Sequence, residues 1–346
     1  MITRKDWILI MEPIKEPTPL VLVTSSPHMH CGLTIGKSMR EVMLALVPAI
    51  IASVYYFRMS AAIVMVTCVV SAIVFETICN KVMHKPNTVQ DGSAALTGLL
   101  LAMCLPASMP PLFAAMGSMF AIVVGKAVFG GLGCNIFNPA HIGRAILLAS
   151  FPQQMTNWVL PATAAASDAV STATPLAVMR ATEKIWQAGG AASAAKLPDL
   201  MNLFWGNVGG SLGETCVPAL VLGGLYLIYK KLIDWRIPVF YLVTVAILTG
   251  VYGAVMGYPS TFPLYHLFAG GLMIGAFFMA TDWVTSPITK KGKIIYAIGL
   301  GVLTSLIRLR GSYTEGVCYS ILMMNMVTPM IDRFVRNVSF GGGLKK

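Results

Sequence analysis

The chain has 346 residues, a formal net charge of +11 at pH 7, and a composition that is 56% hydrophobic and only 11% charged. Soluble globular domains carry about 25% charged residues, so this composition excludes a water-soluble protein and indicates a multi-span helical membrane protein. The lysines and arginines lie in short clusters between apolar runs. Loop charges that orient membrane proteins have this pattern, and it does not indicate a nucleic-acid-binding protein.

From the N-terminus onward, ten stretches are mainly apolar and approach the ~20 residues that a helix needs to cross a bilayer. They lie at 42–57, 60–80, 91–107, 111–130, 138–152, 214–231, 237–256, 263–281, 294–309 and 313–331. Several are short or are interrupted by glycine and proline, as expected where backbone lines a buried site instead of lipid. We therefore predict an all-α integral membrane protein of about ten transmembrane helices, some of them broken.

The positive charges predict the orientation of these spans. With ten spans, every cluster falls on the same side of the membrane, which the positive-inside rule makes cytoplasmic. The charges are Lys37, Arg40, Lys81, Lys85, Lys230, Lys231, Arg236, Lys290, Lys291, Lys293, Arg333, Arg336, Lys345 and Lys346. The terminal segments 1–37 and 333–346 are then cytoplasmic, and the long connection 153–213 is extracytoplasmic. The first segment shows no pattern of a cleavable signal peptide.

The two membrane segments, 38–152 and 214–332, contain five predicted spans each and show a weak internal similarity. In the first, FGGLGCNIFNPAHIGRAILL (Phe129–Leu148) follows Met103–Pro106, and in the second RLRGSYTEGVCYSILMM (Arg308–Met324) follows Met279–Asp282. Because each half has an odd number of spans, a repeat would be inverted in the membrane. Two inverted five-helix repeats with broken helices would place a site near the bilayer midplane, between the halves.

The glycine-rich break in the first half carries the polar groups that are most easily interpreted as a site. Gly130, Gly131 and Gly133 permit close backbone approach, and Asn135 and Asn138 offer amide donors and acceptors. One interpretation is a helix-packing seam, because buried amides need partners. The other is a pocket for a planar, hydrogen-bonding ligand such as an isoalloxazine ring. The tripeptide 138–140 also spells the aquaporin Asn-Pro-Ala motif, but the chain has one copy where aquaporins have two.

Acidic residues within or near the spans predict an ion pathway, since a carboxylate inside a bilayer is costly and is a functional hypothesis by default. Asp282 and Glu76 lie deepest and are our candidates for this pathway. Carboxylates suit Na⁺ and protons alike, so the sequence does not choose between these ions. For the other acids a solvated structural role stands beside a functional one. Arg308 and Arg310 could snorkel, pair with Glu315 or hold a phosphate, and we expect one of the first two roles. The seven cysteines include no C-x-x-C pair and no zinc-like spacing, so we expect no metal site and no iron–sulfur cluster.

The connection 153–213 contains the hydroxyl-rich stretch SDAVSTATPLA and no histidine. A serine or threonine nucleophile needs an adjacent base, usually histidine, so acyl-transfer catalysis is not expected here. A hydroxyl in this stretch remains a suitable substrate for covalent modification by another enzyme.

The segment DAVSTAT (Asp168–Thr174) resembles the flavinylation motif Asp-x-x-Ser/Thr-x-Ala-Thr of the RnfD/NqrB family of membrane subunits. The resemblance extends to the blocks DGSAALTGLLLAMCLP, FGGLGCNIFNPA and MATDWVTSP, which occur in the family order. It implies that a flavin transferase joins the phosphate of FMN to the side-chain oxygen of Thr174 through a phosphoester. Asp168, Ser171 and Ala173 complete the motif, whereas Thr172 stands where the family commonly has glycine.

The resemblance further implies a multi-pass subunit of the Rnf complex in the bacterial cytoplasmic membrane. That complex passes electrons from reduced ferredoxin to NAD⁺ and couples the flow to Na⁺ or H⁺ export, with iron–sulfur and flavin-carrying partner subunits. A noncovalent riboflavin near Asn135 and Asn138, with Gly131 and Gly133, is also implied. Two alternatives without flavin are a small-solute channel or secondary transporter built from inverted repeats, and a structural scaffold whose Gly271-x-x-x-Gly275 motif favours helix contacts.

Overall fold

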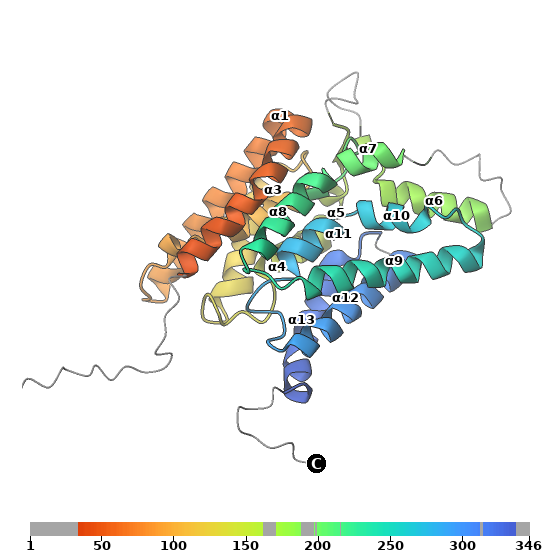
Figure 1. Cartoon of the computed structure of the whole chain (residues 1–346). Coiled ribbons are helices and arrows are strands. Elements are labelled where there is room, and N and C mark those ends of the chain that lie inside the picture. Colours follow the sequence, from red (N-terminus) through yellow and green to blue (C-terminus); the bar gives the residue numbers. More distant parts are fainter. Residues whose placement is uncertain are drawn as a thin grey trace, which may run out of the picture. The chain divides into compact units, whose positions relative to one another are not determined.

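The computed structural model describes residues 34–161, 171–187, 197, 199–214, 216–311 and 314–336. Predictions for segments 1–33 and 337–346, and for Asp168, lie outside these residues. All helices described below belong to one unit, Ile35–Lys346 (Figure 1).

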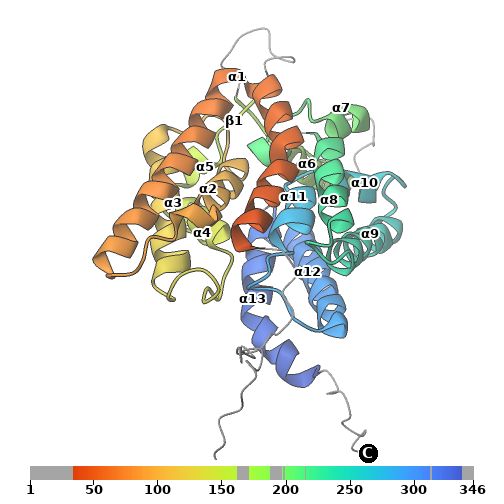
Figure 2. The ribbon, with the colours of Figure 1, turned by 60° about the vertical axis from the view of Figure 1, so that its left-hand side comes forward.

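The chain enters the bundle with a helical hairpin, α1 (Ile35–Val82), whose 48 residues are bent at Arg58. Arg58 has a φ of 51°, which turns the chain sharply, and the two arms run in opposite directions from this turn (Figure 2). At 1.5 Å per residue, 48 residues would extend about 72 Å as a straight helix, more than twice a bilayer core of about 30 Å. The two arms match the predicted spans 42–57 and 60–80.

The rest of the first half consists of shorter apolar helices packed against this hairpin. After the turn η1 (Val89–Asp91) come α2 (Ser93–Met103) and α3 (Pro111–Ile122), which continues as the π-helical segment η2 (Val123–Ala127). α4 (Pro139–Ser150) follows a glycine-rich loop. α2 is buried along most of its length. A glycine makes this possible, because a Cβ at Gly98 would lie 2.5 Å from the Cys68 carbonyl oxygen of α1.

The connection between the halves contains the only two strands of the described residues. After α5 (Pro152–Met155), β1 (Trp158–Val159) pairs antiparallel with β2 (Ser171–Thr172), and Trp158 lies opposite Thr172. α6 (Pro175–Gln187), α7 (Leu200–Trp205) and the short turn η4 (Leu212–Glu214) complete the connection.

The second half contains α8 (Val217–Tyr229), α9 (Arg236–Met256), α10 (Phe262–Phe268), α11 (Leu272–Ile274), η5 (Gly275–Met279), α12 (Lys290–Arg310) and α13 (Val317–Phe334). α10 and the segment formed by α11 and η5 are bent by 64° relative to each other at 269–271. Gly270 and Gly271 adopt positive φ at this bend. The buried guanidinium of Arg308 donates to the carbonyl oxygens of His266, Ala269 and Gly270, which the break leaves without helical partners.

The structure confirms a mainly helical membrane protein, and helical segments occur at all ten predicted apolar stretches. Among the described residues, α1, α9 and α12 are long and apolar enough to cross a membrane, and the bent pair of α10 with α11–η5 qualifies as a broken span. α2, α3 with η2, and α8 are shorter apolar helices.

Contacts between loops show which loops share an end of the bundle. Lys85 Nζ donates to the Gly130 carbonyl (2.7 Å), and Trp283 Nε1 donates to the Leu232 carbonyl (2.6 Å). The Ile288 N–H donates to Asp332 (3.1 Å), which brings the end of α13 to the loop before α12. At the opposite end, the Tyr56 hydroxyl donates to the Trp205 carbonyl (2.8 Å). The loops after α1 and α8 and before α12, where lysines and arginines cluster, therefore share one end, which we call the basic end.

Candidate functional site

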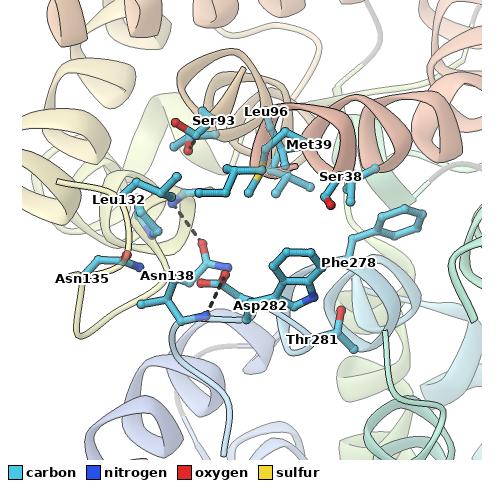
Figure 3. Close-up of a pocket in the computed structure, with 18 of the residues that line it drawn as sticks. Ser38, Met39, Ser93, Leu96, Leu132, Asn135, Asn138, Phe278, Thr281 and Asp282 are labelled. Carbon is cyan, nitrogen blue, oxygen red and sulfur yellow. Dashed lines mark hydrogen bonds between the residues drawn. The ribbon is translucent and has the colours of Figure 1, made fainter. Parts of the chain in front are cut away.

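A cavity of about 270 Å³ lies toward the basic end, between the start of α1, α2, the start of α4, α8 and the end of η5. Its volume is near the lower end of the ~300–1,000 Å³ that small-molecule sites usually occupy. Its walls are mainly apolar, with Met39, Leu96, Phe278 and Trp283 among them. The polar lining residues are Ser38, Ser93, Thr97, Lys126, Asn135, Asn138, Thr281 and Asp282. Asn138 and Asp282 lie on the side opposite Met39 (Figure 3).

Asn138 both caps α4 and joins the two halves of the chain. Its Oδ1 accepts hydrogen bonds from the N–H groups of Ala140 (3.1 Å) and His141 (3.5 Å), and Pro139 occupies the first helical position. Its Nδ2 donates to the carbonyl oxygen of Met279 (3.3 Å), 141 residues away at the end of η5. The backbone bonds of Asn138 agree with the packing-seam interpretation. Asn138 also lines the cavity, and the binding of a planar ligand there stays a prediction. These bonds also give the Asn-Pro-Ala tripeptide a structural role that needs no channel.

Asn135 and the glycines differ in how they relate to the cavity. Asn135 is buried, lines the cavity and donates from Nδ2 to the Phe137 carbonyl (3.0 Å). Gly133 also lines it, whereas Gly131 does not. Gly131 and Gly133 have φ of 113° and 91°, a backbone conformation that other residues rarely adopt. Gly131 thus shapes the loop that carries Asn135 and does not itself face the cavity.

Asp282 lies in the same cavity as the two asparagines. Its carboxylate accepts hydrogen bonds from the Thr285 hydroxyl (3.2 Å) and the Val284 N–H (3.5 Å). The ion pairs of the described residues do not include Asp282. The carboxylate of Asp282 therefore lies in the cavity with Asn135 and Asn138, the residues predicted to hold a flavin. It has no cationic partner among the described residues.

Thr174 lies in the segment 153–213, away from this cavity. β2 leads into it, and its Oγ1 accepts a hydrogen bond from the Ala177 N–H (3.2 Å) in the first turn of α6. Its side chain is buried, at 8% exposed, whereas Ala173 beside it is exposed. Ser171 lies in β2, paired with Val159. The predicted attachment residue is thus held by a strand on one side and a helix start on the other.

Sequence comparison decides the family. The sequence model of the NQR2, RnfD, RnfE family matches residues 22–341. The chain belongs to this family. It is 52% identical to a subunit of the proton-translocating ferredoxin:NAD(+) oxidoreductase complex of Clostridium ljungdahlii, over 92% of this chain and 96% of that protein. It is 45% identical to a subunit of the Na(+)-translocating ferredoxin:NAD(+) oxidoreductase complex of Acetobacterium woodii, over 92% and 95%. The resemblance noted from the motifs is therefore confirmed.

In this member of the NQR2, RnfD, RnfE family, Glu76 does not line the cavity itself, but it binds Lys126, which does. Glu76 is buried on α1 and accepts two hydrogen bonds from Lys126 Nζ, at 2.8 and 2.9 Å. Lys126 lines the cavity and also donates to the Ser93 hydroxyl (2.6 Å). We did not predict Lys126 from the sequence. The sequence did contain a signal for Lys126, because this lysine lies within the apolar run AIVVGKAVFG. It belongs to the π-helical segment η2, and such segments are often found at functional sites.

The remaining predicted charges have partners of different kinds. Arg308 does not snorkel, since it is buried and bound to carbonyl oxygens, including that of Glu315 (2.8 Å). Arg310 is exposed at the end of α12, as a snorkelling residue would be. The carboxylate of Glu315 pairs instead with Arg144 of α4. Glu214 is buried, which contradicts the solvated role that was one of its two interpretations.

Proposed function

We propose that this chain is the flavin-carrying membrane subunit of an ion-translocating ferredoxin:NAD⁺ oxidoreductase. It passes electrons through FMN joined to Thr174 by a phosphoester, and electron flow is coupled to Na⁺ or H⁺ transport. The observation that carries this proposal is the sequence DAVSTAT (Asp168–Thr174), which directly precedes α6 in a member of this family. The names of the two relatives, each a subunit of such a complex, support the assembly. We propose that its other subunits hold the iron–sulfur and further flavin groups.

The surroundings of Thr174 fit a phosphoester. Its side-chain oxygen lies beside the first N–H groups of α6, and the N-terminus of a helix favours negative charge. The pairing of β2 with β1 fixes the chain just before the threonine. A phosphate at this oxygen would gain N–H donors and lose mobility, which keeps a bound carrier at the protein and close to its electron partners.

The cavity fits the planar ring system of a second flavin, for which riboflavin is our proposal. The apolar walls of Phe278, Trp283 and Leu96 suit the faces of a ring, and the amides of Asn135 and Asn138 suit its polar edge. A bound flavin supplies one- and two-electron transfer. The residues of the chain bind and orient it, and the capping bonds of Asn138 hold its amide in a fixed position.

Asp282 is the proposed site of the coupled ion. A carboxylate in the same cavity as a redox group responds to the charge of that group, because electrostatic interactions are strong where water is excluded. Moving one charge across the membrane requires about 2.3 kcal/mol per 100 mV, so the ion affinity of the site must change by an amount of that order. Lys126, paired with Glu76, offers a second charge in the cavity wall whose position depends on that carboxylate.

We further propose two five-helix inverted repeats in the bacterial cytoplasmic membrane. Similar packing in the two halves supports the repeat. α1 packs on α3 and α3 on α4, as α9 packs on α12 and α12 on α13, and α4 meets α13 between the halves. The loops of the basic end would be cytoplasmic by the positive-inside rule. The segment that carries Thr174 would then face the outside, where a flavin transferase acts on it.

In-gel flavin fluorescence tests the covalent attachment. The chain is expressed with its flavin transferase, fully denatured, and separated by electrophoresis. We expect a fluorescent band for the wild type and for the matched control Thr172→Ala, and a dark band for Thr174→Ala. A dark wild-type band contradicts covalent FMN, and a fluorescent Thr174→Ala band contradicts the choice of residue.

A further inference from the structure

His141 is a buried histidine beside the cavity with polar atoms that the fold does not satisfy. It follows Ala140, a cavity-lining residue, in the first turn of α4, and it is 1% exposed. Neither ring nitrogen has a hydrogen-bond partner among the described residues. Leaving a buried polar atom unpaired costs about 1–3 kcal/mol, and such atoms in native proteins call for an explanation by water, an ion or a chemical role.

One turn further along the same face of α4, Arg144 pairs with Glu315. Arg144 Nη1 donates to Glu315 Oε1 (2.6 Å), and Nη2 donates to Oε2, so the contact is bidentate. Arg144 is buried, and Glu315 lies two residues before the start of α13. Polar groups therefore continue from the cavity into the contact between α4 and α13, where the two halves meet.

Glu214 extends the polar groups toward the segment that carries Thr174. It lies in η4, is 8% exposed, and interacts electrostatically with Glu315 and Arg144. Its Oε1 accepts a hydrogen bond from the Ser211 hydroxyl (2.9 Å). Two residues before Ser211, Gly209 lies so close to β2 that a Cβ there would be 2.4 Å from Thr172 Oγ1. His141, Glu315 and Glu214 thus lead from the cavity to the opposite end of the bundle.

These residues lie where the helices of the bundle are broken. η4 is inserted between the end of α2 and the end of α11, since a Cβ at Gly213 would meet Met103 O at 2.7 Å and Ile274 Cδ1 at 2.8 Å. Glu315 Oε1 lies against Gly271, at the bend between α10 and α11. Broken helices at the interface of two halves are where membrane transporters place their ion sites. Ionisable residues buried in such a place form a functional hypothesis by default.

We infer that His141, Glu315 and Glu214 relay protons between the cavity and the opposite end of the bundle. This inference rests on the proposed function and deepens it, since it assigns H⁺ to the coupled ion and names its path. The fixed charge of Arg144 disfavours a cationic imidazole nearby. His141 therefore accepts a proton from a hydronium ion in the cavity on one ring nitrogen, which leaves neutral water, while the other ring nitrogen releases its own proton.

One O–H bond of the hydronium ion breaks as the new N–H bond forms, and the N–H bond at the other ring nitrogen breaks, so the imidazole stays neutral as its other tautomer. The released proton passes, directly or through water, to the carboxylates of Glu315 and Glu214 and then to water beyond Ser211. Rotation of the ring restores the first tautomer. No oxidant or reductant takes part in the step itself.

The test compares His141→Gln with the matched control His266→Gln in the assembled complex, reconstituted into vesicles. His266 is also a buried histidine without a ring hydrogen-bond partner among the described residues, but it lies on α10, away from α4. Glutamine keeps polar groups in place but does not exchange ring protons. We expect proton transport per electron to fall by about tenfold or more in His141→Gln, as for other losses of a proton-transfer group, and to stay near the wild-type value in His266→Gln.

A second pair of variants tests the proton relay if the His141→Gln complex does not assemble. Glu214→Asp keeps a proton-accepting carboxylate and should retain transport, whereas Glu214→Gln should lose it. Undiminished transport in His141→Gln or in Glu214→Gln overturns the relay, as does an equal loss in His266→Gln. Flavin fluorescence of the same preparations separates the two proposals. A wild type without covalent flavin contradicts the proposed function, and normal flavin with undiminished transport in the variants contradicts the relay alone.

Discussion

Glu183 shows how burial tunes a single carboxyl at the surface of the bundle. It lies on α6 and is 7% exposed, and its Oε1 is 3.9 Å from His266 Nε2. Burial raises the pKa of the Glu183 carboxyl from its ordinary 4.5 to about 7, although the charge of Arg180 acts in the opposite direction. A carboxyl whose pKa is raised in the folded state stabilises that state while it is protonated, and this stability is lost as pH rises through about 7.

We therefore predict that α6 packs less firmly on the bundle in alkaline solution. Between about pH 6 and about pH 8, limited proteolysis within the connection 153–213 should become faster in the wild type. Glu183→Gln, which stays neutral, should remove this difference after correction for the activity of the protease. Equal pH dependence in the wild type and the variant would show that another group is responsible.

At the scale of elements, the ion pair between Glu76 and Lys126 joins α1 to η2, the π-helical continuation of α3. Both side chains are buried, and the Ser93 hydroxyl ties the lysine to the start of α2 as well. Removing one partner of a buried pair leaves the other charge without compensation and costs about 3–5 kcal/mol, whereas replacing both by apolar or neutral groups is often nearly neutral.

Glu76→Gln should therefore lower the free energy of unfolding of the purified protein by about 3–5 kcal/mol. The double variant Glu76→Gln with Lys126→Met should recover most of this loss. Thermal unfolding in detergent measures both. The double variant also tests the ion pathway. If it transports ions normally, Glu76 is structural, and Asp282 is the remaining one of the two carboxylates that the sequence suggested for the ion pathway. If it folds but does not transport, Glu76 belongs to the pathway.

Hydropathy predicts single elements well because a bilayer leaves few choices for apolar segments, and helical segments occur at every stretch predicted. It does not predict how an element is broken. The stretch 263–281 reads as one span, yet it bends by 64° at two glycines of positive φ. Arg308, about 40 residues further along the chain, provides the donors that satisfy the freed carbonyls, and no local pattern reveals such a distant partner.

At the scale of the whole molecule, the same limit applies to the site. Asn135, Asn138 and Asp282 were each visible in the sequence as polar residues in apolar surroundings. The sequence did not show that they converge on one cavity, because Asn138 bonds to Met279, close to Asp282, across 141 residues of chain. The roles of Lys126 and Arg144 were not predicted for the same reason. The role of a cation within an apolar run depends on which carboxylate it pairs with, and that carboxylate can be distant in sequence. Glu315 is 171 residues from Arg144.

The orientation of the molecule in the membrane has a direct test. Cys134 is exposed in the loop between η2 and α4, which Lys85 joins to the basic end. In a variant that retains Cys134 as its sole cysteine, a membrane-impermeant maleimide should label inverted vesicles and not right-side-out ones. A cysteine-free variant carrying Ala173→Cys, also an exposed position, should show the opposite pattern. Labelling of both positions from one side would contradict the proposed topology.

The burial of Thr174 has a consequence for the order of events during biogenesis. A transferase must bring its own active site against the threonine oxygen, but here that oxygen is buried and bonded to the first turn of α6. Under the proposed function, attachment of FMN therefore has to precede the docking of α6, while the connection is still extended, or wait for α6 to detach. In the first case a chain that carries the proposed flavin would no longer expose its attachment point, and a chain that folds before it meets the transferase would remain unmodified.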